Sequence, residues 1–145
     1  MKRKEQRDLL VKSVFAHFFQ KDLSLNSIIV NISQSFSKEK VTEIDQKKYF
    51  APLVTQLDHN ELSFQAIISK HLKKTWKIER LPLLDIAILE VAIAEINYLP
   101  EIPFDVTVNE AVDLTKKYST EKSPSFVNGI LVSINRDLKE SNTPS

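Results

Sequence analysis

The sequence contains a single glycine, Gly129, among its 145 residues. Loops that cradle phosphate groups, the turns of dinucleotide-binding folds and tight β-hairpins all need residues that accept positive φ, and glycine is the residue that does so at least cost. The scarcity of glycine therefore argues against phosphate-loop and dinucleotide-binding α/β folds, and against most all-β folds.

Apolar residues recur with the period of a helix in nearly every segment, and no alternating stretch is longer than a few residues. We predict an all-α fold, a compact bundle of about seven helices in two packed helical subdomains. Residues 1–139 are expected to form one domain, with an N-terminal subdomain over 1–75 and a C-terminal subdomain over 76–139. Residues 140–145 have no apolar side chain and are expected to form a flexible tail.

Four local features refine this expectation. Residues 83–97 are apolar on almost every side, which predicts a helix at the centre of the bundle. Pro52 lacks a backbone donor and is predicted to kink the third helix. Thr107 and Glu110 have the spacing of a capping box, which predicts a helix start there. Gly129 lies inside the last predicted helix, where glycine costs ~1 kcal/mol relative to alanine, so we expect another helix to approach it closely.

The composition also limits the chemistry. The absence of cysteine removes disulfides, thiolate metal sites and thiol nucleophiles, and it is compatible with a reducing compartment such as a cytoplasm. His17, His59 and His71 share no metal-ligand or acid–base spacing, and His71 lies on an apolar helix face, where a satisfied histidine is the usual reading. We therefore predict no enzyme activity, no metal and no cofactor.

Charge and hydropathy further restrict the partners. The 20 lysines and arginines nearly balance 19 acidic residues, so a site for a polyanion must be a local patch. The most apolar run, residues 81–99, contains Asp85, Glu90 and Glu95, which are too costly for a membrane span. These carboxylates are spaced by five residues, or ~140° around a helix, so they cannot converge on one substrate. Two roles are open for the three carboxylates: they lie at the rim of a buried helix, or they contact a protein partner. We assign Asp85 and Glu90 to partner binding.

The start of the chain is basic. Arg3, Lys4 and Arg7 continue the side of the first helix whose later turns carry its apolar stripe. Cations near a helix N-terminus oppose the helix dipole, so stability does not explain them. We predict that these three side chains project beyond the body of the protein and bind a polyanion, the alternative being a solvated, fraying terminus. Lys12 lies one turn from Asp8 and is expected to form an ordinary ion pair.

A second candidate patch lies at the start of the last helix. Phe126 offers an aromatic platform close to Lys122, where backbone donors are also free. Lys116 and Lys117 could extend the basic strip. The alternatives are that Phe126 belongs to the core and that the lysines cover a solvated helix end.

Several segments resemble one family. Residues 109–118, NEAVDLTKKY, and residues 126–131, FVNGIL, resemble the paired C-terminal signature of NusB transcription antitermination proteins, and residues 11–19 are similar to a weaker version of the family's first helix. The other positions that match the family's spacing are Trp76, Arg80, Asp85, Ile88, Leu89 and Pro103.

The resemblance implies an all-helical protein that binds the boxA element of nascent ribosomal RNA together with the ribosomal protein NusE, within the RNA polymerase antitermination complex. In the family the arginine-rich start of the first helix meets RNA, and the matching positions here are Arg3, Lys4 and Arg7. The central helix departs from the family pattern, because Glu90 and Ala94 replace a usual arginine and tyrosine.

Further departures leave other functions open. Glu5 and Gln6 interrupt the basic run, whereas Lys122 stands where an acidic residue is frequent in the family. A protein-interaction module, or a homodimer that hides the basic helix and has little RNA affinity, is the main alternative. A third is the NusB-like domain that precedes some RNA methyltransferases, whose catalytic part would have to lie elsewhere.

Overall fold

The computed structural model describes residues 1–36 and 39–141, and every regular element in those ranges is helical. Seven helices of nine residues or more are joined by a short helix and two single turns of other helical types. In chain order the elements are α1 (Arg3–His17), α2 (Leu25–Phe36), α3 (Glu43–Asp45), the π-helical turn η1 (Gln46–Phe50), α4 (Ala51–His59), α5 (Glu61–Lys70), the 3₁₀ turn η2 (Ile78–Arg80), α6 (Leu83–Tyr98), α7 (Phe104–Tyr118) and α8 (Ser123–Ser141). The predicted all-α bundle is confirmed.

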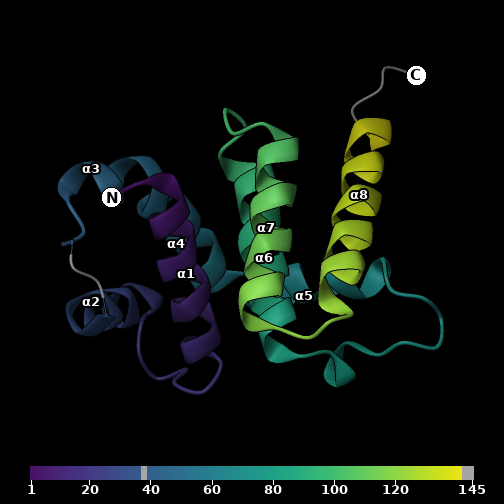
Figure 1. Ribbon diagram of the computed structural model, residues 1–145, viewed down its shortest axis with the longest axis horizontal. Coiled ribbons are helices and arrows are strands. Elements are labelled where there is room, and N and C mark those ends of the chain that lie inside the picture. The colour runs from purple at the N-terminus through teal and green to yellow at the C-terminus, as the bar shows by residue number, and fades with distance from the viewer. Residues whose placement is uncertain (37–38, 142–145) are drawn as a thin grey trace.

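Helix α6 lies at the centre of the molecule, as its apolar sequence predicts. Its residues 85–95 are all buried. It packs against α1, α4 and α5 on the N-terminal side and against α7 and α8 on the C-terminal side (Figure 1). Buried apolar residues from Leu9 to Ile134 form one cluster around it. The core is therefore continuous across both halves of the chain, and the subdomain division at residues 75 and 76 stays a prediction.

Three of the four local expectations are changed by the structure, those at Pro52, Thr107 and Gly129. The irregularity at Pro52 takes the form of the π-helical turn η1 directly before it, where the chain accommodates the missing backbone donor. Thr107 does not begin a helix, because α7 already starts at Phe104 and the Thr107 side chain is buried and donates to Glu95. The predicted capping box at Thr107 and Glu110 is wrong.

Gly129 is exposed on α8 rather than covered by a neighbouring helix. A β-carbon built at this position meets nothing within 4 Å, and the residue has no positive φ. The expected close approach of another helix is therefore wrong, because the backbone at Gly129 faces open space.

Replacing Gly129 with alanine should raise the free energy of unfolding by about 0.5–1 kcal/mol, because alanine loses less backbone entropy in a helix. Chemical denaturation of the two proteins, followed by circular dichroism, measures the difference. A loss of stability on this substitution would show that the glycine is needed for a contact in solution.

The last helix, α8, completes the fold at the C-terminal end of the described residues. Helix α8 continues to Ser141, so residues 140 and 141 are helical; the rest of the expected flexible tail, residues 142–145, lies outside the described residues. No helix in the described part of the chain is both long and apolar enough to span a bilayer.

Candidate nucleic-acid interface

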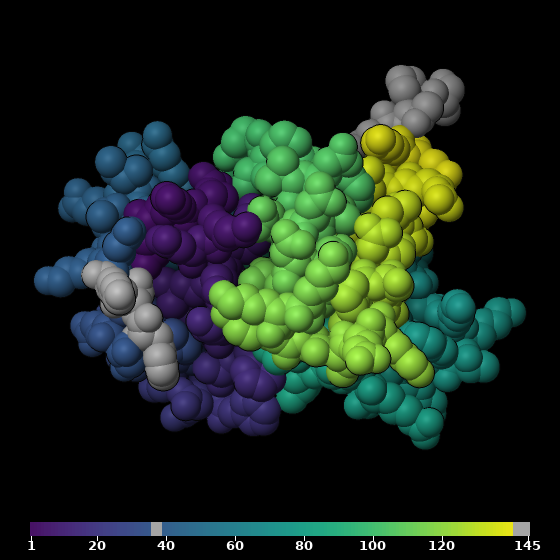
Figure 2. Space-filling view, viewed as in Figure 1, coloured from purple at the N-terminus to yellow at the C-terminus, as the bar shows by residue number. Residues whose placement is uncertain are grey.

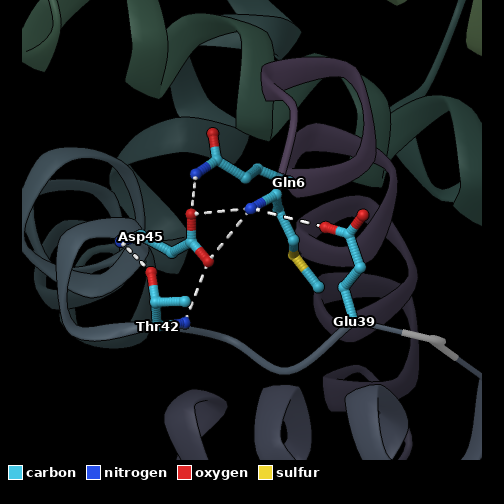
Figure 3. A network of polar contacts seen from close by, with 5 residues as sticks. Gln6, Glu39, Thr42 and Asp45 are labelled. Atoms are coloured by element: carbon cyan, nitrogen blue, oxygen red, sulfur yellow. Dashed lines mark hydrogen bonds and ion pairs between the residues drawn. The ribbon is translucent and has the colours of Figure 1, made fainter.

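The first turns of α1 pack against the turn that begins at Thr42. Gln6 Nε2 donates to Asp45 Oδ1 at 2.8 Å, and the amino group of Met1 lies 3.3 Å from the same oxygen. The other carboxylate oxygen of Asp45 accepts the backbone N–H of Thr42 at 2.9 Å (Figure 3). Burial alone would raise the pKa of Asp45, but its hydrogen bonds with Thr42 and Gln6 hold that pKa below its usual value. The start of α1 is thus attached to the body, and its expected overhang is wrong.

Arg7 is buried, with 3% of its surface exposed. Its Nε and Nη2 atoms donate to the two carboxylate oxygens of Glu95 on α6 at 2.6 and 2.9 Å. Tyr49 and Thr107 donate their hydroxyls to the same carboxylate at 2.6 and 3.0 Å. Because an internal carboxylate compensates this guanidinium and protein encloses it, the expectation that Arg7 projects into solvent is wrong. We leave Arg7 out of the candidate interface.

Arg3 and Lys4 differ in their surroundings. Arg3 is partly buried, with its guanidinium carbon 4.8 Å from the centre of the Tyr49 ring. Lys4 is exposed and makes no ion pair with any described residue. Arg3 also forms no ion pair with a described residue, but its Nη1 atom is buried, so Lys4 is the one of the three predicted cations that is both exposed and unpaired among the described residues.

Lys4 lines a groove of about 380 Å³ between α1 and α7. The residues that line the groove carry charges of both signs. Lys117 Nζ, for example, lies 3.3 Å from Asp8 in the same groove. Lys12 also pairs with Asp8, at 3.4 Å, which confirms the pair expected from sequence. The other residues that line the groove are Arg7, Glu110, Asp113 and Leu114. This groove is not a strongly positive channel, and Lys4 is the exposed cation of its lining that forms no ion pair with a described residue.

Phe126, at the start of α8, stacks against Trp76 from the segment between α5 and α6. The ring centres are 5.4 Å apart and the ring planes differ by 24°. Trp76 remains 47% exposed, so much of its ring is open to solvent. Lys122 is exposed beside this pair and lines the same surface hollows. The structure thus brings Lys122 and Phe126 together, with a second aromatic ring added.

His71 ties this segment to α8. Its Nδ1 atom lies 2.7 Å from Ser133 Oγ, and its Nε2 atom lies 3.2 Å from an oxygen of Asp137. Both ring nitrogens have partners, which confirms the expectation of a satisfied histidine. The tie fixes the start of the segment that carries Trp76 against the helix that carries Phe126.

Asp85 holds the start of α8 in place. Its two carboxylate oxygens accept the hydroxyls of Ser119 and Ser123 at 2.6 and 2.8 Å. Asp85 is itself buried, with both oxygens engaged inside the protein. The assignment of Asp85 to direct partner contact is therefore wrong; it positions the loop that precedes α8 and carries Lys122.

Glu90 is also buried, with 1% of its surface exposed. Its Oε2 atom has no hydrogen-bond partner among the described residues. Burial, together with the nearby charge of Glu61, raises the pKa of Glu90 from 4.5 to about 8, although Lys21 and Gln65 act in the opposite direction. Glu90 therefore holds a proton at neutral pH, and its assignment to direct partner contact is wrong because the side chain does not reach the surface.

The sequence profile of the NusB family matches residues 4–136, which is nearly the whole chain. The chain belongs to the NusB family. The transcription antitermination protein NusB of Listeria welshimeri is 34% identical over 134 residues, which are 92% of this chain and 96% of the relative. The NusB protein of Alkaliphilus oremlandii is 32% identical over 131 residues, covering 90% and 91% of the two chains.

Solved structures show the same architecture. T. maritima NusB is 30% identical to this NusB-family chain, with a TM-score of 0.80 over 94% of this chain and 92% of that one. A NusB chain from a complex of NusB and NusE with double-stranded RNA has a TM-score of 0.78 and 24% identity, covering 93% and 96%; this likeness concerns the fold. The resemblance noted in the sequence is confirmed.

The candidate residues of this NusB-family protein fall into two places. In Figure 1, α1 lies in the left half of the molecule and α8 at its right, with α6 and α7 between them. Sequence reasoning noted Trp76 for the family resemblance alone and missed its neighbours Lys73 and Lys77. The available signal was the segment KKTWK, residues 73–77, in which lysines flank the single tryptophan of the chain.

Proposed function

We propose that this NusB-family protein is a transcription antitermination factor that binds boxA-type single-stranded RNA in nascent ribosomal transcripts. It acts with the ribosomal protein NusE in the RNA polymerase antitermination complex of the bacterial cytoplasm, and it makes and breaks no covalent bond. Its family membership supports this proposal, as does the function named for its relatives, transcription antitermination.

One observation carries the RNA part of this proposal. Lys4 on α1 and Lys122 before α8 are exposed and unpaired among the described residues, and Phe126 follows Lys122 by one helical turn. Helices α1 and α7 and the start of α8 share the face drawn in Figure 2. Lysines that contact phosphates give most of the affinity for nucleic acid, and aromatic rings stack on unpaired bases. We propose that a single strand follows this face and meets both lysines.

Replacing Lys4 and Lys122 together with alanine is expected to weaken RNA binding without changing the unfolding midpoint. Each lost phosphate contact reduces the slope of log affinity against log salt by about 0.7 for single strands, so the slope should fall by about 1.4. Titration of boxA-type RNA at several salt concentrations measures it. The matched control replaces Lys47 and Lys48, exposed lysines on η1. An unchanged slope in the Lys4 and Lys122 variant would contradict the proposal.

A protein-interaction module with little RNA affinity is the second candidate. The burial of Arg7 and the mixed charge of the groove between α1 and α7 favour it. Exposed apolar side chains offer a docking face, since Phe19 and Leu83 line a hollow of about 290 Å³. We propose this face for NusE. Binding of NusE, or self-association, without RNA binding at physiological salt would favour the second candidate over the first.

A further inference from the structure

A surface hollow of about 290 Å³ lies where the end of α1, α5, η2 and the start of α6 meet. We call it the Glu61 hollow. Its charged residues are Lys21, Glu61 and Glu79, and Gln65 adds an amide. The lining therefore suits a side chain that has both an apolar part and a charged end. The apolar wall of the hollow consists of Phe18, Phe19, Ile78, Leu83 and Ile86.

The lining of the Glu61 hollow carries more negative than positive charge. Two carboxylates, those of Glu61 and Glu79, face a single ammonium group, that of Lys21. Lys21 Nζ lies 3.2 Å from Glu61, so these two charges compensate each other. Glu79 is exposed and forms no ion pair with a residue in the described ranges. One carboxylate of the hollow is therefore left for a cation that comes from outside the chain.

Glu90 of α6 is buried next to this lining. Its side chain has an Oε2 atom with no hydrogen-bond partner among the described residues. The groups that act on its carboxyl are Glu61, Lys21 and Gln65, and all three line the hollow. Because electrostatic interactions are strong in a poorly hydrated interior, a charge that enters the hollow is expected to act on Glu90.

The proton on Glu90 depends on this balance of groups. Burial and the charge of Glu61 raise the pKa of Glu90 to about 8, so the carboxyl is protonated at neutral pH. In the described part of the chain no charged group of α7 or α8 acts on Glu90, and His17 of α1 pairs with Asp58 of α4 at 3.6 Å. The charged residues that control this proton are therefore those of the hollow.

We propose that the Glu61 hollow receives a basic side chain of the protein partner, arginine or lysine, and that its docking draws the proton from Glu90. This inference rests on the proposed face for NusE and names the chemistry of the group that docks there. The aliphatic stem of such a side chain packs on the apolar wall, and its cation meets Glu61 and Glu79. An apolar side chain would instead cover these carboxylates without compensating them, which is costly.

The proton moves because the charge beside Glu90 changes. A cation next to Glu61 favours the ionised form of Glu90, and Lys21, which then shares Glu61 with the partner, favours it as well. The proton leaves the Glu90 carboxyl for a buffer base in solution, and no covalent bond to carbon is made or broken. Glu90 touches no atom of the partner and acts through the lining of the hollow.

Calorimetric titration of the protein with purified NusE, in buffers of different ionisation enthalpy, counts the protons released on binding. At about pH 7.5 the parent protein should release about half a proton more than the Glu90→Gln variant, which has no proton to give at this position. Because binding favours the ionised form, the affinity of the parent relative to this variant should rise by roughly 3- to 10-fold between about pH 6.5 and pH 8. The matched control, Glu101→Gln, changes an exposed glutamate and should behave as the parent does.

A second variant tests the charge of the occupant directly. Replacing Glu61 and Glu79 together with glutamine keeps the shape of the hollow and removes both of its carboxylates. The affinity for NusE should fall by at least about fivefold, since a docked cation loses its charged acceptors. The matched control replaces Glu43 and Glu101, exposed glutamates outside the hollow, and should leave the affinity near that of the parent protein. The unfolding midpoint of each variant shows that the fold is kept.

Each contrary outcome has its own meaning. If NusE binds but releases no more protons from the parent than from the Glu90→Gln variant, the inference is overturned and the proposed binding of NusE stands. The same holds if the variant of Glu61 and Glu79 binds NusE as tightly as the parent or more tightly, because the occupant is then apolar. If NusE does not bind at all, the inference and the proposed face for NusE both fall, whereas the RNA titrations still decide the RNA part of the proposed function.

Discussion

Replacing Glu95 with alanine should lower the free energy of unfolding by about 3–5 kcal/mol, because removal of one partner leaves a buried charge uncompensated. Glu95 accepts two hydrogen bonds from Arg7 and one each from Tyr49 and Thr107, and all four residues are buried. The carboxylate of Glu110, 3.8 Å from Arg7 Nη1, offers only weak replacement. Urea denaturation at neutral pH measures the loss.

A matched substitution tests the origin of this effect. Glu101 is an exposed glutamate that pairs with no described residue, and replacing it with alanine should change stability by less than about 0.5 kcal/mol. The double variant of Arg7 and Glu95 should lose less than the sum of the two single variants, since each single change strands the other charge. Equal losses for Glu95 and Glu101 would contradict the role of the network.

This network also bears on tests of function. Arg7 joins α1 to α6, and Glu95 joins both to α7 through Thr107. A substitution at Arg7 is therefore expected to destabilise the protein and to weaken RNA binding indirectly. Lys4, which is exposed three residues earlier, is the informative position for RNA contact at the start of α1.

Replacing Glu90 with glutamine should make the protein more stable at alkaline pH, by up to about 4–5 kcal/mol, since each unit of pKa shift corresponds to about 1.4 kcal/mol. The pKa of Glu90 is raised from 4.5 to about 8, chiefly by burial. Between these two values the folded protein keeps a proton that the unfolded chain releases, so the stability from this group falls as pH rises. Glutamine has a similar shape and cannot ionise.

Denaturation of both proteins at several pH values between 5 and 9 isolates this group, since all other titrating groups are shared. The stability difference should be small near pH 5, grow as the pH rises and level off above about pH 8. A difference that stays constant with pH would show that Glu90 is charged in the folded protein at neutral pH.

The position of Glu90 explains why the departure from the family pattern is tolerated. The side chain lies within the central helix, near the pair formed by Lys21 and Glu61, whose charged atoms are 3.2 Å apart. At neutral pH a protonated carboxyl avoids the cost of a buried charge. The residue therefore contributes to the interior of the protein and not to a surface that a partner could read directly.

Sequence reasoning succeeded where a property depends on one segment at a time. The apolar character of residues 83–97 predicted the central place of α6, because a helix that is apolar all round must be covered on all sides. It failed at Gly129, where an expected neighbour is absent, and at Thr107, where a capping pattern lies inside a helix. The first failure concerns what lies opposite a residue in space, and the second concerns where along the chain a helix begins.

The candidate site shows the same division. The periodicity of α1 placed Arg3, Lys4 and Arg7 on related sides of one helix, but it could not reveal that Glu95 faces Arg7. Likewise the pattern near Phe126 suggested an aromatic platform, whereas its stacking partner Trp76 belongs to a loop far earlier in the chain.

The amino-acid sequence by itself determined the all-helical fold, through its apolar period and its single glycine, and it determined membership of the NusB family through its C-terminal motifs. Only the tertiary structure decided which cations are enclosed and which are available, and it alone brought the rings of Trp76 and Phe126 together. The physical reason is that a helical period fixes the direction of a side chain about its own axis, whereas burial and pairing depend on the helix or loop that packs against it.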